Sequence, residues 1–336
     1  MSEPAGTPTI PLPTITDEGE PTTPDLADRL AARLAAGLTW WANRNARRTA
    51  RRHRRRDAGP SIWEPIHLGI GENGRPVRVA LIYRNMLLAG EPGAGKSVGL
   101  NNIVAHAALS TDCRLWLLDG KIVELGLWRA CAERFVANSL SDAVEALLDL
   151  QSEMDSRYAV LDRDKRRKIT SADGFTPIVM VVDELAYFSA TVGTKREQEA
   201  FSVLVRDLVA RGRAAGIIVV AATQRPSADI IPTSLRDLFG YRWAFRCTTD
   251  TSSDIVLGHG WASRGYTAAS IAPETKGIGF LLAEGGIPRR IKSAYLTDEQ
   301  VYALADTAAG RRRAAGLSAP EAIGIPVPAE DSGSTS

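Results

Sequence analysis

One segment of this chain restricts its fold more than any other. Residues 90–97 read Gly-Glu-Pro-Gly-Ala-Gly-Lys-Ser, which fits the phosphate-binding P-loop pattern G-x-x-x-x-G-K-[ST]. The glycines allow a tight turn in which successive backbone N–H groups point at phosphate oxygens. Lys96 is expected to reach the β- and γ-phosphates, and the Ser97 hydroxyl is expected to hold Mg²⁺. The residues expected to bind nucleotide are Gly90, Glu91, Pro92, Gly93, Ala94, Gly95, Lys96, Ser97 and Val98.

The segments on either side of this loop have the composition that a P-loop requires. Residues 85–89 contain a short apolar run that predicts a buried strand. Residues 98–110 are rich in alanine and contain no proline, which predicts a helix whose N-terminus faces the phosphates. A chance match in a glycine-rich turn is the alternative, and the strand–loop–helix context argues against it.

Two further strand ends carry polar residues suited to phosphate chemistry. Residues 178–182 predict a buried strand that runs into Asp183 and Glu184, the pattern of a Walker B element. Asp183 is expected to support the Mg²⁺ ion, and Glu184 to orient the attacking water. A strand that ends in two acids by chance is the alternative, but the upstream P-loop favours the functional interpretation. Residues 217–222 predict a strand beside the P-loop strand, and Gln224 at its tip is expected to hydrogen-bond the γ-phosphate or the water.

The remaining pattern alternates strands with helices. Strands are expected over residues 66–70, 76–82, 114–119, 241–247, 277–283 and 288–295, and helices over 139–161, 197–213 and 296–309. A turn at residues 72–74 joins the first two strands into a hairpin, and a second hairpin closes the sheet. Residues 162–174 are expected to form a basic exposed loop. The predicted fold is α/β, a RecA-like P-loop ATPase core with a central, mainly parallel sheet flanked by helices.

The first sixty residues differ from the rest in composition. Residues 1–24 are rich in proline and threonine and contain no lysine or arginine, which predicts a disordered tail. Residues 25–60 begin as an amphipathic helix and run into eight arginines between Arg44 and Arg56, so they form a polybasic arm. Three interpretations of the arm stay open: a solvated charge run, a contact to nucleic-acid phosphates, or a contact to an anionic membrane. Trp40 and Trp41 would suit the membrane interpretation.

The chain is therefore expected to hold four parts. They are the tail over 1–24, the arm over 25–60, an ATPase domain over 61–296, and a C-terminal helix with Arg311, Arg312, Arg313 and a disordered tail over 297–336. The three cysteines and four histidines are scattered, which indicates neither a disulfide framework nor a zinc site. No run of 18 apolar residues and no signal-peptide pattern occur, so a cytoplasmic protein is expected. Any membrane contact would be peripheral or made through a partner.

Five strings give the chain its resemblance to a known family. They are Gly74-Arg75-Pro76, Lys96-Ser97-Val98-Gly99-Leu100-Asn101, Asp119-Gly120-Lys121-Ile122-Val123-Glu124-Leu125, Glu153-Met154-Asp155-Ser156-Arg157-Tyr158, and the Arg213–Ile217 segment running on to Ala222-Thr223-Gln224-Arg225-Pro226-Ser227. With them, residues 66–300 resemble the FtsK/SpoIIIE DNA translocases of the FtsK–HerA group. The usual Thr-Gly-Ser-Gly-Lys-Ser is here Pro-Gly-Ala-Gly-Lys-Ser, and the usual Asp-Pro-Lys is Asp-Gly-Lys. The compact length, without membrane spans or a winged-helix module, resembles the actinomycete members that move plasmid or integrated DNA between cells.

The resemblance implies an ATP-driven motor on double-stranded DNA. It implies a hexameric ring with ATP and Mg²⁺ between neighbouring subunits, and an arginine that reaches into the neighbour's site. Arg213 matches that arginine best and Arg211 is second. Two alternatives remain. One is an ATPase of type VII protein secretion, which a single domain with an arginine-rich arm disfavours. The other is a nucleotide-gated coupling module, which would not need the water-activating Glu184.

Overall fold

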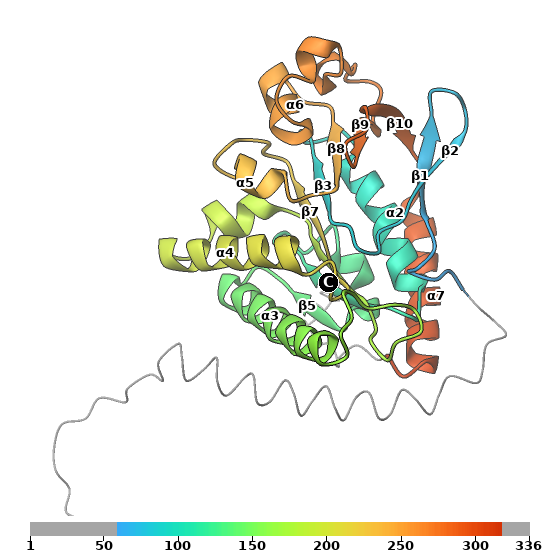
Figure 1. The fold of residues 1–336 in the computed structure, drawn as a ribbon. Coiled ribbons are helices and arrows are strands. Elements are labelled where there is room, and N and C mark those ends of the chain that lie inside the picture. Colours follow the sequence, from blue (N-terminus) through green and yellow to red (C-terminus); the bar gives the residue numbers. More distant parts are fainter. Residues whose placement is uncertain (1–58, 318–336) are drawn as a thin grey trace, which may run out of the picture.

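The computed structural model describes residues 59–317 (Figure 1). The tail predicted over residues 1–24, nearly all of the arm, and the chain after residue 317 lie outside the described residues. The described part forms one ten-stranded sheet with helices on both faces. The predicted α/β class with a mainly parallel sheet is confirmed.

The elements follow one another along the chain in this order. The strands are β1 (Ile66–Gly71), β2 (Pro76–Val79), β3 (Met86–Ala89), β4 (Arg114–Leu118), β5 (Arg134–Val136), β6 (Ile178–Val182), β7 (Ile217–Thr223), β8 (Tyr241–Phe245), β9 (Ile278–Ala283) and β10 (Arg289–Ser293). The helices are α2 (Lys96–Leu109), α3 (Leu140–Arg163), α4 (Lys195–Arg211), α5 (Thr233–Arg236), α6 (Asp250–Leu257) and α7 (Asp298–Ala314). Short irregular helices are η1 (Gly126–Cys131), η2 (Tyr187–Thr191), η3 (Ala262–Arg264) and η4 (Ala268–Ser270).

The strand order across the sheet is β2-β1-β10-β9-β8-β3-β7-β6-β4-β5. From β5 to β8 every pair is parallel, and from β8 to β2 every pair is antiparallel. Both predicted hairpins are therefore present, as β1–β2 and β9–β10. The terminal hairpin is not a free appendage, because β10 also pairs with β1 and joins the first hairpin to the main sheet.

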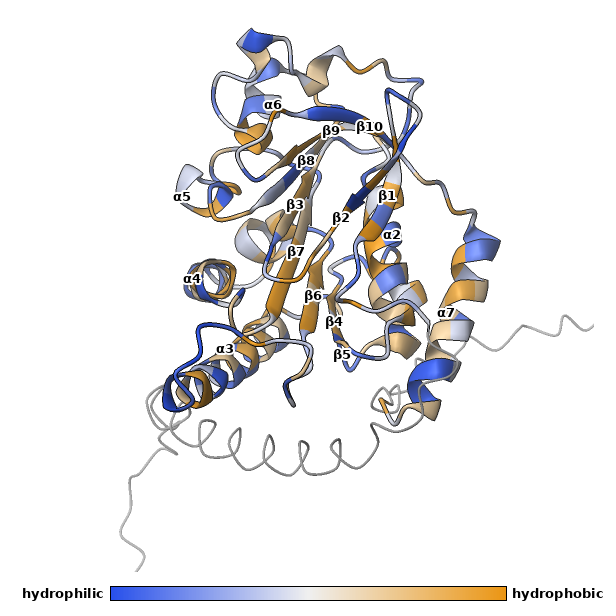
Figure 2. Cartoon of the chain, turned by 45° about the vertical axis from the view of Figure 1, so that its right-hand side comes forward, coloured by the Kyte–Doolittle hydropathy of each residue, from blue (hydrophilic) through white to orange (hydrophobic). Residues whose placement is uncertain are grey.

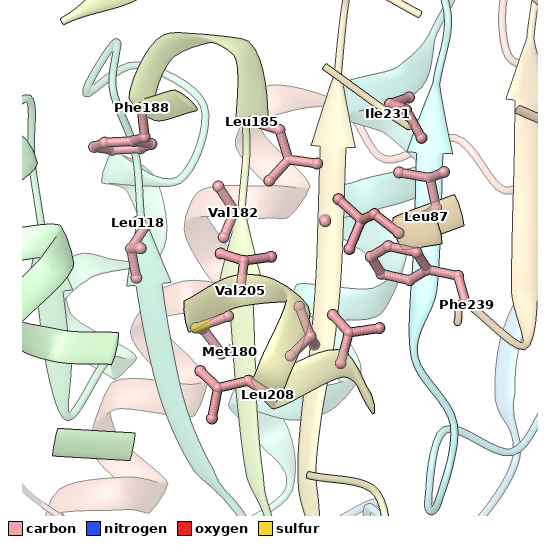
Figure 3. Close-up of a cluster of buried hydrophobic side chains, with 14 of the residues drawn as sticks. Leu87, Leu118, Met180, Val182, Leu185, Phe188, Val205, Leu208, Ile231 and Phe239 are labelled. Carbon is pink, nitrogen blue, oxygen red and sulfur yellow. The ribbon is translucent and has the colours of Figure 1, made fainter. Parts of the chain in front are cut away.

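The central strands are hydrophobic because helices cover both of their faces. Every residue of β3, β4, β6 and β7 is buried. Successive residues belong to opposite layers, so Leu87 packs with α3 and α4, whereas Leu88 packs with α2 and α7. Figure 2 shows the apolar strands between the helical layers, and Figure 3 shows Leu87 and Met180 in one layer with Val205 and Leu208 of α4. This two-layered core holds the carboxyl ends of the parallel strands at one edge.

Several local expectations need correction. Helix α2 begins at Lys96, two residues earlier than expected, and α4 ends at Arg211 rather than at residue 213. Helix α3 begins at Leu140, where the Ser139 hydroxyl caps it by accepting from the Asp142 N–H at 3.2 Å. The basic loop over residues 162–174 is anchored, because Ile169 is fully buried against its neighbours. The helices α5 and α6 and the turns between them were not predicted from the sequence.

Arg312 is the largest correction in the C-terminal region. The sequence suggested that the helix ends near residue 309, but α7 continues to Ala314 and Arg312 is only 1% exposed. Its guanidinium donates to the carbonyls of Ala107 (3.4 Å), Ala108 (3.3 Å), Ser110 (3.1 Å) and Cys113 (3.0 Å). These carbonyls lie at and just beyond the C-terminus of α2, where a cation also complements the helix dipole. Arg312 thereby fixes α7 to the end of the P-loop helix.

We expect Arg312→Met to lower the free energy of unfolding by about 2 kcal/mol, because buried carbonyls would lose their donor. Methionine keeps much of the side-chain volume, so the loss would report on hydrogen bonds and charge rather than on a cavity. Arg313→Met is the matched control, since Arg313 is exposed on the same turn of α7. Urea denaturation of the two variants measures the difference. An equal effect of both substitutions would show that the contacts at Arg312 contribute little.

Candidate active site

The candidate site lies where the parallel strands β3, β4, β6 and β7 end. The P-loop follows β3, Asp119 follows β4, Asp183 and Glu184 follow β6, and Gln224 follows β7. Because these strands are neighbours in one parallel register, their ends lie at the same edge of the sheet. Ligands of open α/β sheets bind at this edge. The fold therefore brings together the residues that the sequence singled out on three different strands.

The P-loop turns as its glycines allow. Gly93 and Gly95 have φ angles of +75° and +92°, a region that favours glycine. A Cβ on Gly95 would lie 2.3 Å from the backbone nitrogen of Gly277, which donates to the Ala94 carbonyl at 2.9 Å. The residue before β9 thus packs closely against the P-loop and holds it in place. Only glycine fits at position 95.

Lys96 and Asp183 form a buried ion pair at the centre of the site. The Lys96 ammonium is 2.9 Å from Oδ1 and 2.9 Å from the backbone oxygen of Asp183. The two residues are 3% and 0% exposed. The second carboxylate oxygen of Asp183, Oδ2, is buried and has no protein partner in the described part of the chain. An unsatisfied carboxylate oxygen on Asp183 and the hydroxyl of Ser97, which follows Lys96 in the first turn of α2, are oxygen donors of the kind that Mg²⁺ prefers.

Glu184 is held by the end of β7. Its Oε1 accepts from the Thr223 hydroxyl at 2.5 Å, and its Oε2 accepts from the backbone N–H of Gln224 at 2.9 Å. Glu184 is almost fully buried, whereas Gln224 is half-buried. Glu184 and Gln224 were predicted from the sequence as site residues, whereas Thr223 was not. Its position one residue before Gln224, at the end of a neighbouring strand, was the available signal.

The P-loop carries an acid that needs neutralising. Oε2 of Glu91 lies 2.9 Å from an amino nitrogen of Arg246, just after β8, and the Glu91 N–H donates to the Arg246 carbonyl at 3.0 Å. A free carboxylate in this loop would repel phosphate oxygens. The ion pair with Arg246 removes most of that repulsion. Sequence reasoning did not find Arg246, because nothing in the local pattern links it to residue 91.

Asp119 shapes the loop that follows β4. Its Oδ1 accepts from the N–H groups of Lys121 (3.0 Å) and Ile122 (2.9 Å), and its Oδ2 from those of Leu125 (2.7 Å) and Gly126 (3.1 Å). A fully buried carboxylate with four N–H donors is satisfied, so it fixes the backbone rather than binding a ligand. The Asp-Gly-Lys string therefore encodes a rigid loop beside the P-loop.

The two arginines considered for the neighbour's site lie away from Lys96. Both precede β7, so they sit at the edge of the sheet opposite to its end at Thr223. Arg211 is paired with Asp207 at 2.6 Å and with Asp155 at 2.8 Å. These hydrogen bonds raise the pKa of the Arg211 guanidinium above its ordinary value, and the one to Asp207 contributes most. Arg213 is exposed, and no ion pair to another described residue holds it.

Other chemistries have little support in the described part. Residues 59–317 contain no group of three or more histidine, cysteine, aspartate or glutamate side chains that could hold a metal ion. The three cysteines are free and buried, and burial raises the pKa of the Cys113 thiol to about 12, so it stays protonated near neutral pH. None of the helices between residues 59 and 317 is long and apolar enough to cross a membrane.

Residues 64–177 match the model of the FtsK/SpoIIIE family. This core belongs to that family. A DNA translocase FtsK of Corynebacterium glutamicum is 31% identical over 255 residues, which are 68% of this chain and 26% of that protein. Another DNA translocase FtsK, of Staphylococcus epidermidis, is 29% identical over 271 residues, 73% of this chain and 32% of that protein. The chain thus spans less than a third of the length of these relatives.

Solved structures show the same fold. The pCW3 conjugation coupling protein TcpA, solved as a monomer with ATPγS, superposes with a TM-score of 0.64 at 22% identity, over 74% of this chain and 71% of that one. The cytoplasmic domain of the type VII secretion ATPase EccC of Thermomonospora curvata gives 0.58 at 21% identity, over 79% and 32%. At these identities the likeness concerns the fold alone. Family and fold together place this core among the P-loop domains of the FtsK/SpoIIIE type.

Proposed function

We propose that this protein hydrolyses ATP to move double-stranded DNA and that it works as a ring of identical subunits, a hexamer by its resemblance to the family. The observation that supports the proposal most strongly is the way in which hydrogen bonds hold the Glu184 side chain. Its carboxylate is fixed by Thr223 and Gln224 next to the Lys96–Asp183 pair. A module that only binds nucleotide has no need of a second, precisely held acid beyond the Mg²⁺ ligand.

Each residue of the proposed site has a separate role in ATP hydrolysis. Lys96 exchanges its contact with Asp183 for the β- and γ-phosphate oxygens when ATP binds. Ser97 and the free Oδ2 of Asp183 would hold Mg²⁺, and the ion would supply positive charge to neutralise the phosphates. Glu184 accepts a hydrogen bond from the attacking water and directs it at the γ-phosphorus. The Gln224 side chain, at the rim of the site, senses the γ-phosphate.

The position of Arg213 supports a ring. Its own P-loop lies at the opposite edge of the sheet, so Arg213 does not serve the site of its own subunit. An exposed guanidinium without an ion pair is suited to the charge of a triphosphate presented by a neighbour. A closed arrangement of identical subunits gives every site such an arginine.

DNA is the substrate that the curated relatives favour, since those quoted above are named DNA translocases. That the DNA is double-stranded is proposed on the resemblance to the family. A polypeptide is the second candidate, because the fold is shared with type VII secretion ATPases. ATP hydrolysis measured with and without linear duplex DNA distinguishes the two. Stimulation by duplex supports the proposal, whereas a rate that DNA leaves unchanged would contradict it. Transfer of plasmid or other mobile DNA between cells is the host process we propose, on the resemblance to compact family members.

The basic arm offers a test of the contact to DNA. If the eight arginines between Arg44 and Arg56 bind phosphates, replacing them with glutamine should weaken duplex binding and flatten its dependence on salt. The slope of log affinity against log salt is about −0.9 per neutralised phosphate, so we expect it to fall in magnitude by several units. Duplex affinity at two salt concentrations measures this. An unchanged slope, together with lost binding to anionic vesicles, would assign the arm to a membrane instead.

A further inference from the structure

Three strands at one end of the sheet, β2, β1 and β10, have a face that is open to solvent in the described part of the chain. On the side of α2 and α7 these strands bury Ile66, Val79 and Ile291. The register places Ile66 opposite Val79, so the residues that alternate with them point to the other side of the sheet. Helix α6 packs on that side of β8 and β9, whereas on the three end strands the side chains are exposed or, at Arg290, half-buried. These side chains, which we call the basic strand face, are His67 and Ile70 of β1, Pro76 and Arg78 of β2, and Arg290 and Lys292 of β10.

The basic strand face carries unpaired positive charge. Arg78, Arg290 and Lys292 are basic, and no residue of the face is acidic. None of these three forms an ion pair with another residue between 59 and 317. In the turn between β1 and β2, Glu72 and Arg75 carry opposite charges, so the turn adds no net charge. Figure 2 shows β10 as hydrophilic, in contrast to the apolar strands at the centre of the sheet. Cations that no neighbouring acid neutralises attract a polyanion.

We propose that the basic strand face binds the phosphate backbone of duplex DNA. The inference rests on the proposed movement of DNA and adds a surface that contacts it, outside the nucleotide site. Neighbouring strands lie about 4.8 Å apart, so Arg78 and Lys292, which are two strands apart, are separated by roughly 10 Å across the sheet. The phosphates of one DNA strand recur every ~3.4 Å along the helix axis, so a face of this width meets several of them. A membrane would require more large apolar side chains than Ile70, and a second copy of the same face would bring like charges together.

The basic strand face is connected to the P-loop through the residues that precede β9. The Lys292 ammonium donates to the carbonyl of Lys276, and the Ser293 N–H donates to the carbonyl of Gly277 at 2.8 Å. Gly277 in turn donates to the Ala94 carbonyl of the P-loop at 2.9 Å. A phosphate that binds Lys292 therefore acts on a side chain whose hydrogen-bond partner directly precedes the residue that contacts the P-loop. We expect DNA on this face to raise the rate of ATP hydrolysis, and loss of Lys292 to lower that stimulation.

The test removes two cations from the face and compares the result with the loss of two cations elsewhere. Arg78→Gln combined with Lys292→Gln should reduce the slope of log duplex affinity against log salt by about two units, since each phosphate contact contributes about 0.9. Stimulation of ATP hydrolysis by duplex should fall with it. Lys165→Gln combined with Arg167→Gln is the matched control, because both residues are exposed in the loop after α3 and the change in charge is the same. Fluorescence anisotropy of a labelled linear duplex, measured with the full chain at several salt concentrations, gives the slopes. The arginines of the arm are present in every variant, so a difference between the variants belongs to the face.

Arg78→Gln alone provides a variant that leaves the P-loop undisturbed, because Arg78 is exposed on the edge strand β2. We expect it to reduce the slope by about one unit, and Arg78→Lys to keep the wild-type slope, because a phosphate accepts either cation. Unchanged slopes in a protein that binds duplex would overturn the DNA contact at this face and leave the proposed motor standing. A wild-type protein that neither binds duplex nor is stimulated by it would overturn both. An equal loss in the control would assign the effect to net charge. A change in the number of associated subunits, measured by sedimentation, with unchanged duplex affinity would assign the face to contacts between copies, and either of these two results overturns the proposal.

Discussion

The Glu184→Gln variant should bind ATP as the wild type does and lose between about a hundredfold and ten-thousandfold in turnover. Glutamine has almost the same size, but its amide cannot take a proton from water. One of its two terminal groups is a donor, so it also cannot accept both from the Thr223 hydroxyl and from the Gln224 N–H. Hydrolysis of ATP under saturating conditions, together with equilibrium binding of ATPγS, measures the two effects separately.

Three controls give this result its meaning. Glu199→Gln makes the same chemical change at an exposed position of α4 and should leave hydrolysis unchanged. Lys96→Ala should lose nucleotide binding itself. Thr223→Val removes the shortest of the hydrogen bonds that hold Glu184, so we expect a smaller loss of turnover than in Glu184→Gln. Wild-type hydrolysis by Glu184→Gln would show that another group activates the water.

The strands and helices that carry the site were predictable because their signals are local. Each signal lies within about ten consecutive residues. This holds for the P-loop, for the buried strand that ends in Asp183 and Glu184, and for the strand that ends near Gln224. Three contacts could not be predicted in this way. They are those of Thr223 with Glu184, of Arg246 with Glu91, and of Arg312 with the end of α2. Each pair joins residues from distant parts of the chain, and a local pattern does not indicate which strands become neighbours. Short elements such as α5 lack the periodicity that predicts a helix.

The Glu153–Tyr158 string illustrates the difference between recognising a motif and explaining it. In the structure Glu153 is buried between Arg114, at 2.5 Å, and Arg157, at 2.6 Å. Burial acts to raise the pKa of Glu153, but Arg157 and Arg114 outweigh it and hold that pKa at about 2. Arg157 also donates to the Ala215 carbonyl at 2.7 Å. The string thus ties α3 to the turn before β7, which no spacing rule would have indicated.

That turn is the one that presents Arg213. The Tyr158 hydroxyl donates to the Arg211 carbonyl at 2.6 Å, and Arg157 holds Ala215, so the backbone is anchored on both sides of residue 213. A guanidinium on a fixed turn loses little further freedom when it meets a neighbour's triphosphate. Arg211, the last residue of α4, is already paired with two carboxylates and would have to break those contacts first. The structure thereby gives a physical reason to propose Arg213 rather than Arg211.

Arg213→Ala should therefore keep ATP binding and lose about a thousandfold or more in hydrolysis, the typical contribution of an arginine supplied in trans. Arg211→Ala is the matched comparison and should cost far less. Mixing Arg213→Ala with Lys96→Ala subunits provides the decisive measurement. Where an intact P-loop of the first variant meets the intact Arg213 of the second, the site is complete, which random assembly gives at about one interface in four. Activity that returns only in the mixture requires a site shared between subunits, and its absence at every mixing ratio would exclude Arg213 from that role.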